Sequence, residues 1–170
     1  GLAEGAHNRL KGQVRTLKSV LEEKMPGLRV GPGHLLAPWM VRHAAWVLTR
    51  FSVGHDGATP YRRLRGKPYE HEVLPFGETV EFKLSAVKKG GGQVKMEARW
   101  QPGVWVGKLD LTDEHLLLTP RGVQRARAIQ RKTEGEDWDA AFLGRVRGLP
   151  WNPFGVAVKE SVMLQGPSSI

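Results

Sequence analysis

The hydrophobic pattern of the chain changes near Pro75, and this change constrains the fold more than any other feature. Before Pro75, apolar residues recur every three or four positions, which is typical of amphipathic helices. After Pro75, apolar and polar residues alternate over short segments, which is typical of β-strands. The sequence therefore predicts an α+β chain, with helices in its first part and a sheet in its second.

Three helices are expected before this change. The first covers residues 2–24, where the apolar positions lie three to four residues apart. The second covers residues 35–51 and is apolar around much of its circumference, so it is expected to pack on two sides. The third is short, with Thr59 as its N-cap, Pro60 at its first position and Gly66 at its end.

Five short strands are expected in the second part. They lie at residues 79–84, 95–100, 104–108, 115–119 and 123–129. Gly90 and the two glycines after it indicate a hairpin tip or a loop. Strands so short and so close together are typical of a small antiparallel barrel. We therefore expect helices over residues 1–70, a barrel over 76–132 and a partly irregular, loosely packed tail over 133–170.

Positive charge is the main compositional feature. The 170 residues include 26 Lys and Arg against 17 Asp and Glu, which gives a net charge of +9. Residues 1–70 hold 12 of the cations and 5 of the acids, so the helical part carries most of the surplus. Such a charge attracts polyanions, first nucleic acid and second an anionic membrane surface. A merely solvated surface is the alternative interpretation.

Several classes of protein and site are excluded by what the sequence lacks. No apolar run approaches the roughly 20 residues that span a bilayer, so we expect no membrane partner. Cysteine is absent, which excludes disulfides and thiolate nucleophiles and favours a reducing compartment, nuclear or cytoplasmic. The six histidines lack the paired spacing of zinc ligands, and His43 is expected to be a packed side chain on the second helix.

One face of the first helix carries a set of polar residues that could serve chemistry. Glu4, Asn8, Lys11 and Arg15 follow one another at intervals of four, three and four residues, so they share a face. Glu4 could coordinate a divalent metal ion, and the other three side chains could contact DNA oxygens. On spacing alone, however, an ordinary exposed helix face with charge partners is the favoured interpretation.

A second group of cations lies at the short third helix. Four cations fall within six residues here, and they are Arg62, Arg63, Arg65 and Lys67. Such a cluster could neutralise several DNA phosphates and would make binding strongly dependent on salt. The alternative is a solvated helix end whose cations interact with the helix dipole.

The expected barrel offers a third group. Arg125 and Arg127 fall two positions apart and are expected to point to the same face of its last strand. Trp100 and Trp105 could supply stacking platforms, as in other small barrels that bind nucleic acid. Core packing is the alternative role for at least one of the two tryptophans.

Several segments, in order along the chain, resemble retroelement integrases of the copia and gypsy types. Residues 1–11, with Gly-Leu-Ala-Glu followed by Asn-Arg, are similar to the segment around the third catalytic acid of these enzymes. Residues 56–68, with Thr-Pro-Tyr and then Gly-Lys-Pro, are similar to the segment that closes their catalytic core. Residues 76–78, 100–107 and 123–131 resemble parts of the small barrel that follows this core.

This resemblance implies a fold and a reaction. Residues 1–70 would be the last helices of an RNase H-like core, followed by an SH3-like barrel. The parent enzyme would hold two Mg²⁺ or Mn²⁺ ions between two Asp and one Glu, and it would carry out 3′-end processing and strand transfer on double-stranded DNA. Glu4 matches the Glu of this triad as catalytic residue and metal ligand. The two Asp are expected upstream of Glu4.

On this interpretation the chain by itself is expected to be inactive and to bind no metal tightly. The parent enzyme would act on DNA as a homo-oligomer and would take no small-molecule substrate. Two positions depart from the family pattern. Gly5 follows the Glu where a bulkier polar residue is usual, and Arg62 follows Tyr61 where Glu is usual.

Two other hypotheses are kept open. The chain could be a stand-alone basic barrel that reads chromatin or RNA, with the helices as an interaction arm. It could also be a retroelement relic that folds poorly. In the second case, helices separated from their sheet would leave four apolar side chains exposed, namely Leu10, Val14, Leu17 and Trp46.

Overall fold

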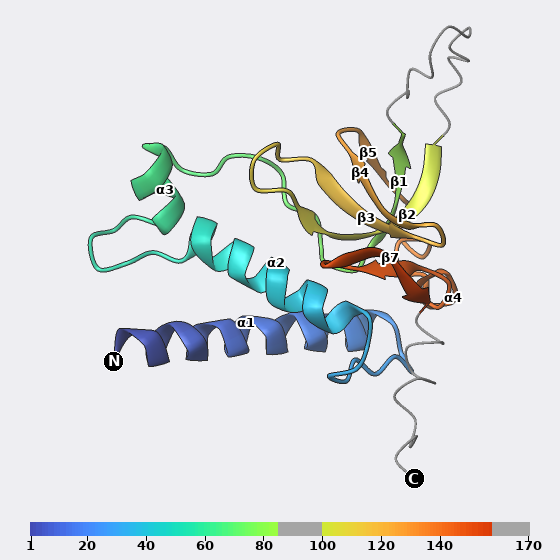
Figure 1. Ribbon diagram of the computed structural model, residues 1–170, viewed down its shortest axis with the longest axis horizontal. Coiled ribbons are helices and arrows are strands. Elements are labelled where there is room, and N and C mark those ends of the chain that lie inside the picture. Colours follow the sequence, from blue (N-terminus) through green and yellow to red (C-terminus); the bar gives the residue numbers. More distant parts are fainter. Residues whose placement is uncertain (85–99, 158–170) are drawn as a thin grey trace, which may run out of the picture.

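The computed structural model describes residues 1–84 and 100–157, and Figure 1 shows how their elements are arranged. The helices are α1 (Leu2–Lys24), α2 (Leu36–Phe51), α3 (Pro60–Arg65) and α4 (Ala140–Leu143). The three expected helices are confirmed, including the Thr59 cap, whose hydroxyl accepts a hydrogen bond from the Arg62 amide at 3.1 Å. None of the described helices combines the length and the apolar character needed to cross a membrane.

The strands follow the expected pattern in part. They are β1 (Thr79–Lys83), β2 (Trp100–Lys108), β3 (His115–Thr119), β4 (Gly122–Ala126), β5 (Ile129–Arg131), β6 (Arg147–Leu149) and β7 (Asn152–Ala157). The strands expected at 79–84, 104–108 and 115–119 are confirmed, the second as part of the longer β2. Residues 95–99 and the turn at Gly90 lie outside the described residues.

The strands form one antiparallel sheet beneath a layer of helices. Its order is β5-β1-β2-β3-β6-β7, and β4 pairs with β3 beside this path. Helix α2 lies against β2, and α1 runs alongside α2 in the opposite direction, with its C-terminal part reaching the start of β1 (Figure 1). The chain is therefore of the α+β class, as its hydrophobic pattern predicts.

The prediction of a single strand at 123–129 is wrong, because the structure has two strands there. β4 ends at Ala126 and pairs with β3, whereas β5 begins at Ile129 and pairs with β1. Ala126 is buried, and the chain bends directly after it to reach the other edge of the sheet. Alternation of side chains does not reveal such a bend, because both strands keep a period of two.

The loose packing expected after residue 133 is also wrong for much of that segment. Helix α4 and the residues after it bury Phe142, Leu143 and Val146 in the main core. The Asp139 side chain caps α4 by accepting a hydrogen bond from the Phe142 amide at 2.9 Å. An element of four residues is too short to show helical periodicity, so these apolar residues could not be assigned from the sequence.

One core connects the helices to the sheet. Leu21 of α1 and Trp39 of α2 are buried in the same cluster as Val104 and Leu118 of the sheet. The Trp39 indole also donates a hydrogen bond to the Gly148 carbonyl at 3.0 Å, which ties α2 to β6. The helices therefore share a core with the sheet. A second buried cluster lies within the β-rich part alone and consists of Leu74, Val80, Phe82, Trp105, Leu117 and Ala126.

The prediction that a helical remnant would leave its apolar side chains exposed is therefore wrong. Trp46 is buried, and Leu10, Val14 and Leu17 are half-buried. The three α1 positions are covered where α1 packs on α2, and Trp46 belongs to α2, which packs on the sheet in turn. The apolar faces that the hypothesis of a poorly folded relic leaves exposed are thus covered within this chain.

Gly77 shows how closely α1 approaches the sheet. Its backbone has a φ of +87°, and a Cβ at this position would overlap the Leu21 side chain. Only glycine adopts this conformation readily, and only glycine leaves the space that Leu21 fills. The Gly77 amide donates to the Trp105 carbonyl at 2.8 Å, so the same residue is also fixed to β2.

The shared core predicts that the helices and the sheet unfold together. Replacing Leu21, which is fully buried, by Ala should lower the free energy of unfolding by about 2–5 kcal/mol. Urea unfolding followed by far-UV circular dichroism and by tryptophan fluorescence should show the same midpoint for both signals. The control is Val20→Ala on the exposed side of α1, with an expected change of about 0.5 kcal/mol. Two separate transitions would contradict a shared core.

Candidate nucleic-acid interface

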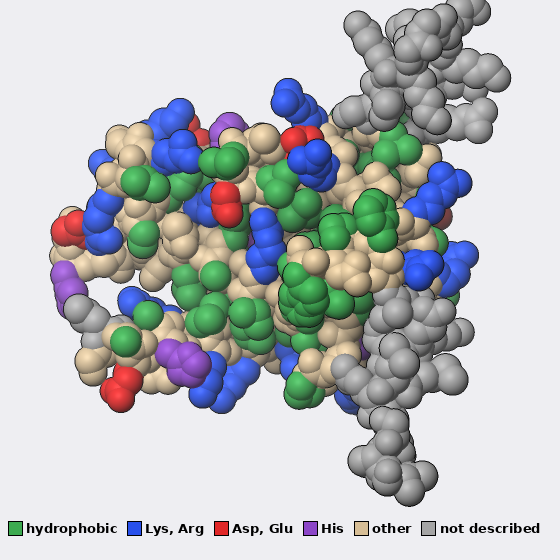
Figure 2. Space-filling model, viewed as in Figure 1, with side chains coloured by type: hydrophobic (Ala, Val, Ile, Leu, Met, Phe, Trp, Pro, Cys, Tyr) green, Lys and Arg blue, Asp and Glu red, His purple; other side chains and the backbone are tan. Residues whose placement is uncertain are grey.

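Three helices meet at one end of the molecule. The first turns of α1, the last turn of α2 and the short α3 come together there (Figure 1). Figure 2 shows Lys and Arg side chains at this end, where the surface is hollowed, as well as elsewhere on the same face. Two of the three groups of site residues expected from the sequence lie on these helices.

The polar face of α1 is fully exposed. Glu4, Asn8, Lys11 and Arg15 all point to solvent, so the structure brings them onto one face as their spacing predicts. Glu4 contacts the N-terminal amino group at 3.4 Å. Within residues 1–84 and 100–157, no three His, Asp or Glu side chains gather into a group that could hold a metal ion. The metal role of Glu4 remains a prediction.

The cluster at α3 is exposed as well, but its members differ. Arg63 is held in place by Asp56, with its Nε donating to Oδ2 at 2.8 Å, and by the Ala58 carbonyl at 3.0 Å. The Arg63 guanidinium also holds the pKa of the Asp56 carboxyl well below its usual range. Arg63 thus braces the loop before α3, whereas the structure records no such brace for Arg62, Arg65 and Lys67 among the residues it describes.

The site residues expected in the β-rich part do not join this end. Arg125 is exposed on β4, and Arg127 lies in the bend after it, so they do not share the single strand that was expected. Trp105 is buried in the core, and its indole donates to His115 Nδ1 at 2.9 Å. Trp105 therefore has the core-packing role and is not accessible for stacking on a base. Trp100, by contrast, is 45% exposed.

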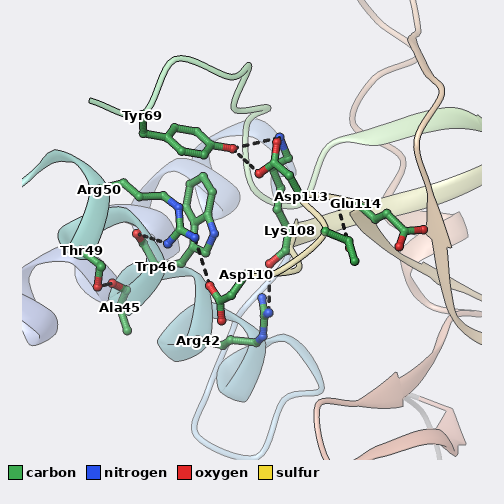
Figure 3. A network of polar contacts seen from close by, with 11 residues as sticks. Arg42, Ala45, Trp46, Thr49, Arg50, Tyr69, Lys108, Asp110, Asp113 and Glu114 are labelled. Carbon is green, nitrogen blue, oxygen red and sulfur yellow. Dashed lines mark hydrogen bonds and ion pairs between the residues drawn. The ribbon is translucent and has the colours of Figure 1, made fainter. Parts of the chain in front are cut away.

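A hollow at this end of the molecule lies between α2, α3 and the loop that joins β2 to β3. Its volume is about 510 Å³. Its walls carry three arginines, two aromatic rings and one carboxylate, and these are Arg42, Arg50, Arg65, Trp46, Tyr61 and Asp110. Figure 3 shows Arg42 and Arg50 of α2 pointing toward this loop, where Asp110 lies.

Arg50 is buried among aromatic rings. Only 6% of its surface is exposed, and its guanidinium lies 4.1 Å from the centre of the Trp46 ring. The Tyr61 and Tyr69 rings lie 5.3 Å from the same guanidinium, a range in which cation–π attraction operates. Arg50 also donates to Asp110 at 3.2 Å, and Asp110 is its only carboxylate partner among the described residues.

Arg42 lies one turn of α2 away from Trp46 and is also largely covered. Its Nη2 donates to the Lys108 carbonyl at 2.9 Å. Burial lowers the pKa of Arg42, while the nearby Asp110 carboxylate opposes this shift. Arg42 Nη1 and Arg50 Nε are both buried, and neither has a hydrogen-bond partner within the described part of the chain.

A buried ion pair fixes the loop that carries Asp110. Lys108 Nζ contacts Asp113 at 2.6 Å, and the Tyr69 hydroxyl donates to the other Asp113 oxygen at 2.6 Å (Figure 3). Burial and this carboxylate raise the pKa of the Tyr69 hydroxyl, which therefore stays protonated. Asp113 adopts a φ of +60° in this turn. The Asp110 side chain is thus presented from a rigid loop.

A second hollow, of about 230 Å³, adjoins the first. Thr49 and Pro60 line both hollows, and Arg9 of α1 and Arg63 line the second. The two hollows together are bordered by five arginines but only one carboxylate, Asp110. We call this surface the arginine end of the molecule and define it by Arg9, Arg42, Arg50, Arg63 and Arg65.

Sequence reasoning found part of this end. It identified the exposed cations of α3 but missed Arg9, Arg42 and Arg50. A signal was present, because Arg42, Trp46 and Arg50 are spaced four residues apart and share a face of a mostly apolar helix. An arginine on the buried side of such a helix needs a partner, and here the partners come from the loop between β2 and β3.

His43 is confirmed as a packed histidine, but the backbone partner that such a residue is expected to have is missing at its buried Nδ1 within the described residues. It is 2% exposed and stacks between Trp46 and Phe76, with ring centres 5.6 Å and 5.5 Å away. Burial, together with the neighbouring Arg42, lowers its pKa to about 4. His43 is therefore neutral near pH 7 and serves the packing of α2 on β2.

Comparisons of the chain with protein-family models, with curated proteins and with solved structures find no match. The resemblance to retroelement integrases therefore depends on the residues and motifs described above.

The pKa of His43 predicts that the protein loses stability in acid. Between pH 6.5 and pH 4 the unfolded chain binds a proton that the folded chain excludes at this residue. The free energy of unfolding should therefore fall through this window, by on the order of 3 kcal/mol from this group. Urea unfolding at closely spaced pH values would measure the effect.

The matched variant is His43→Phe, whose ring stacks but does not titrate. The slope of its free energy of unfolding against pH should be smaller than in the wild-type protein, by an amount equivalent to at most about one bound proton. Some dependence should remain, because burial also lowers the pKa of His34 and of His115. An unchanged pH dependence in the variant would contradict this assignment.

Proposed function

We propose that the protein binds double-stranded DNA through the phosphate backbone, as the C-terminal part of a retroelement integrase. The observation that carries the proposal is the arginine end, where cations from α1, α2 and α3 surround two adjoining hollows. The proposal concerns contact with phosphates and implies no reading of the base sequence.

The charge of this end suits a polyanion. Duplex DNA carries one negative charge for about every 1.7 Å of its axis, so several cations within one surface can each neutralise a phosphate. Arg62, Arg65 and Lys67 are exposed on and just after α3, and Lys11 and Arg15 are exposed on α1. Guanidinium groups donate two parallel hydrogen bonds to phosphate oxygens, which favours arginine in such contacts.

The proposed metal ligand lies on a different face of α1 from the hollows. Ala6, in the first turns of α1, lines the second hollow together with Arg63. Glu4 precedes it by two residues, about 200° around the helix axis, and shares its exposed face with Asn8, Lys11 and Arg15. DNA that contacts both Glu4 and the arginine end would therefore have to pass around the first turns of α1. In the proposed parent enzyme, two upstream Asp would complete the set, and Mg²⁺ or Mn²⁺ would polarise the phosphodiester.

The alternative of a chromatin reader has less support. Trp46, Tyr61 and Tyr69 form the kind of aromatic enclosure that could receive a methylated lysine. Arg50 of the same chain already occupies this enclosure. The shared core likewise speaks against a relic that folds poorly. The proposed partner is therefore DNA, with a homo-oligomer of the parent integrase and a nuclear or cytoplasmic site of action as parts of the same proposal.

Phosphate contacts predict a steep salt dependence of DNA binding. Fluorescence anisotropy with a labelled blunt duplex would measure the dissociation constant over a series of salt concentrations. In the triple variant Arg62→Gln, Arg65→Gln and Lys67→Gln, the slope of log K against log salt should fall by about 0.9 for each phosphate that the variant no longer neutralises.

The control removes the same charge from the other end of the molecule. Lys24→Gln, Arg29→Gln and Arg145→Gln change exposed cations away from α3 and should preserve the slope. If the wild-type protein does not bind the duplex at low salt, the proposal fails. If both triple variants reduce the slope equally, binding reflects net charge and the exposed cations of α3 are not the site.

The proposed catalytic role of Glu4 predicts a loss of strand transfer in a longer protein. In a chain that includes the proposed upstream Asp, Glu4→Gln should abolish Mg²⁺-dependent joining of DNA ends, because the side chain no longer offers a charged metal ligand. Glu23→Gln, on an exposed position of the same helix, should retain it. Full strand transfer by Glu4→Gln would exclude Glu4 from the metal site.

A further inference from the structure

The larger hollow of the arginine end is too small for duplex DNA to enter. Its volume of about 510 Å³ lies in the range of pockets that hold small ligands. A double helix can touch only its rim. A single nucleotide that is not paired can enter, because its phosphate and its base are both free to turn inward.

The polar wall of the hollow already holds an anion. The Asp110 carboxylate contacts Arg50 at 3.2 Å and is close enough to Arg42 to influence its pKa. Asp110 is itself 68% exposed, although Arg50 is buried. A phosphate group offers the same kind of negative charge with more acceptor oxygens for the two guanidinium groups.

The opposite wall is apolar and aromatic. Tyr61 is half-buried there, and Leu64 is 82% exposed one turn along α3. Trp46 is buried and contacts both Arg50, at 4.1 Å, and His43, whereas Tyr61 is half-buried and lies farther from Arg50, at 5.3 Å. Tyr61 is therefore the ring of this wall that is accessible for stacking. Every base has a flat face that can stack on such a ring, which makes the contact tolerant of sequence.

We propose that this hollow binds one unpaired nucleotide of DNA, with its phosphate replacing Asp110 at Arg42 and Arg50 and its base against Tyr61. The inference rests on the proposed DNA binding and adds a class of substrate to it, namely a DNA end or junction with single-stranded nucleotides. Asp110 occupies the phosphate position in the free protein and competes with the ligand.

Two labelled probes test this inference, a blunt duplex and the same duplex with a short single-stranded thymidine overhang. The wild-type protein should bind the overhang probe about tenfold more tightly, the size of effect that stacking of one base gives. Tyr61→Leu should bring the ratio of the two affinities close to one. Tyr61→Phe should restore the preference, and Phe154→Leu, an exposed aromatic elsewhere, should keep it.

Asp110→Asn provides an independent readout. Removing the competing carboxylate should raise affinity for the overhang probe more than for the blunt probe. Glu134→Gln makes the same change in net charge in the loop after β5 and should affect the two probes equally. Asp110→Asn changes no residue of α3 and keeps a side-chain oxygen that can accept a hydrogen bond from Arg50.

The possible outcomes separate the inference from the function on which it rests. Equal affinity of the wild-type protein for both probes would overturn the inference and leave duplex binding in place. Binding of neither probe would overturn the proposed function as well. Displacement of the overhang probe by micromolar thymidine monophosphate would assign the hollow to free nucleotides and overturn the assignment to DNA.

Discussion

The packing of α2 between α1 and the sheet is the interaction on which the rest of the structure depends. Trp39 and Met40 fill the main core against β2 and β3, and His43 stacks beside Phe76. This packing covers apolar surface of the sheet and gives α1 a face to pack on. It also fixes the rotation of α2, and with it the direction in which Arg42 and Arg50 point.

Because α2 has this rotation, Arg50 is buried at the arginine end, and burying its charge has an electrostatic cost. Taking a guanidinium out of water costs several kcal/mol unless its surroundings replace the missing solvation. For Arg50 the replacement comes from Trp46, two tyrosine rings and the Asp110 carboxylate. Because the loop that holds Asp110 is itself braced by Lys108, Asp110 is held beside Arg50 in the free protein, and an anion that binds to Arg50 must displace it.

How far the sequence could predict the candidate site depended on where its residues lie. The exposed cations of α3 form a local cluster with a clear cap and stop, so they could be found by inspection. Arg50 could not be assigned, because its partner Asp110 is sixty positions away and comes close only through the packing of α2 on β2. Trp105 was open to two roles for a similar reason, since an alternating strand does not say which of its faces is covered.

The sequence by itself determined the elements that depend on local pattern and on single residues. These are the three helices before Pro75, the Thr59 cap, the Gly66 stop and most of β1 to β3, because periodicity and capping act over a few neighbours. Only the tertiary structure decided the bend between β4 and β5, the burial of Phe142 and the meeting of Arg9, Arg42 and Arg63 at one end. Those features arise from interactions between distant segments, which compete with local preference and leave no short-range signature.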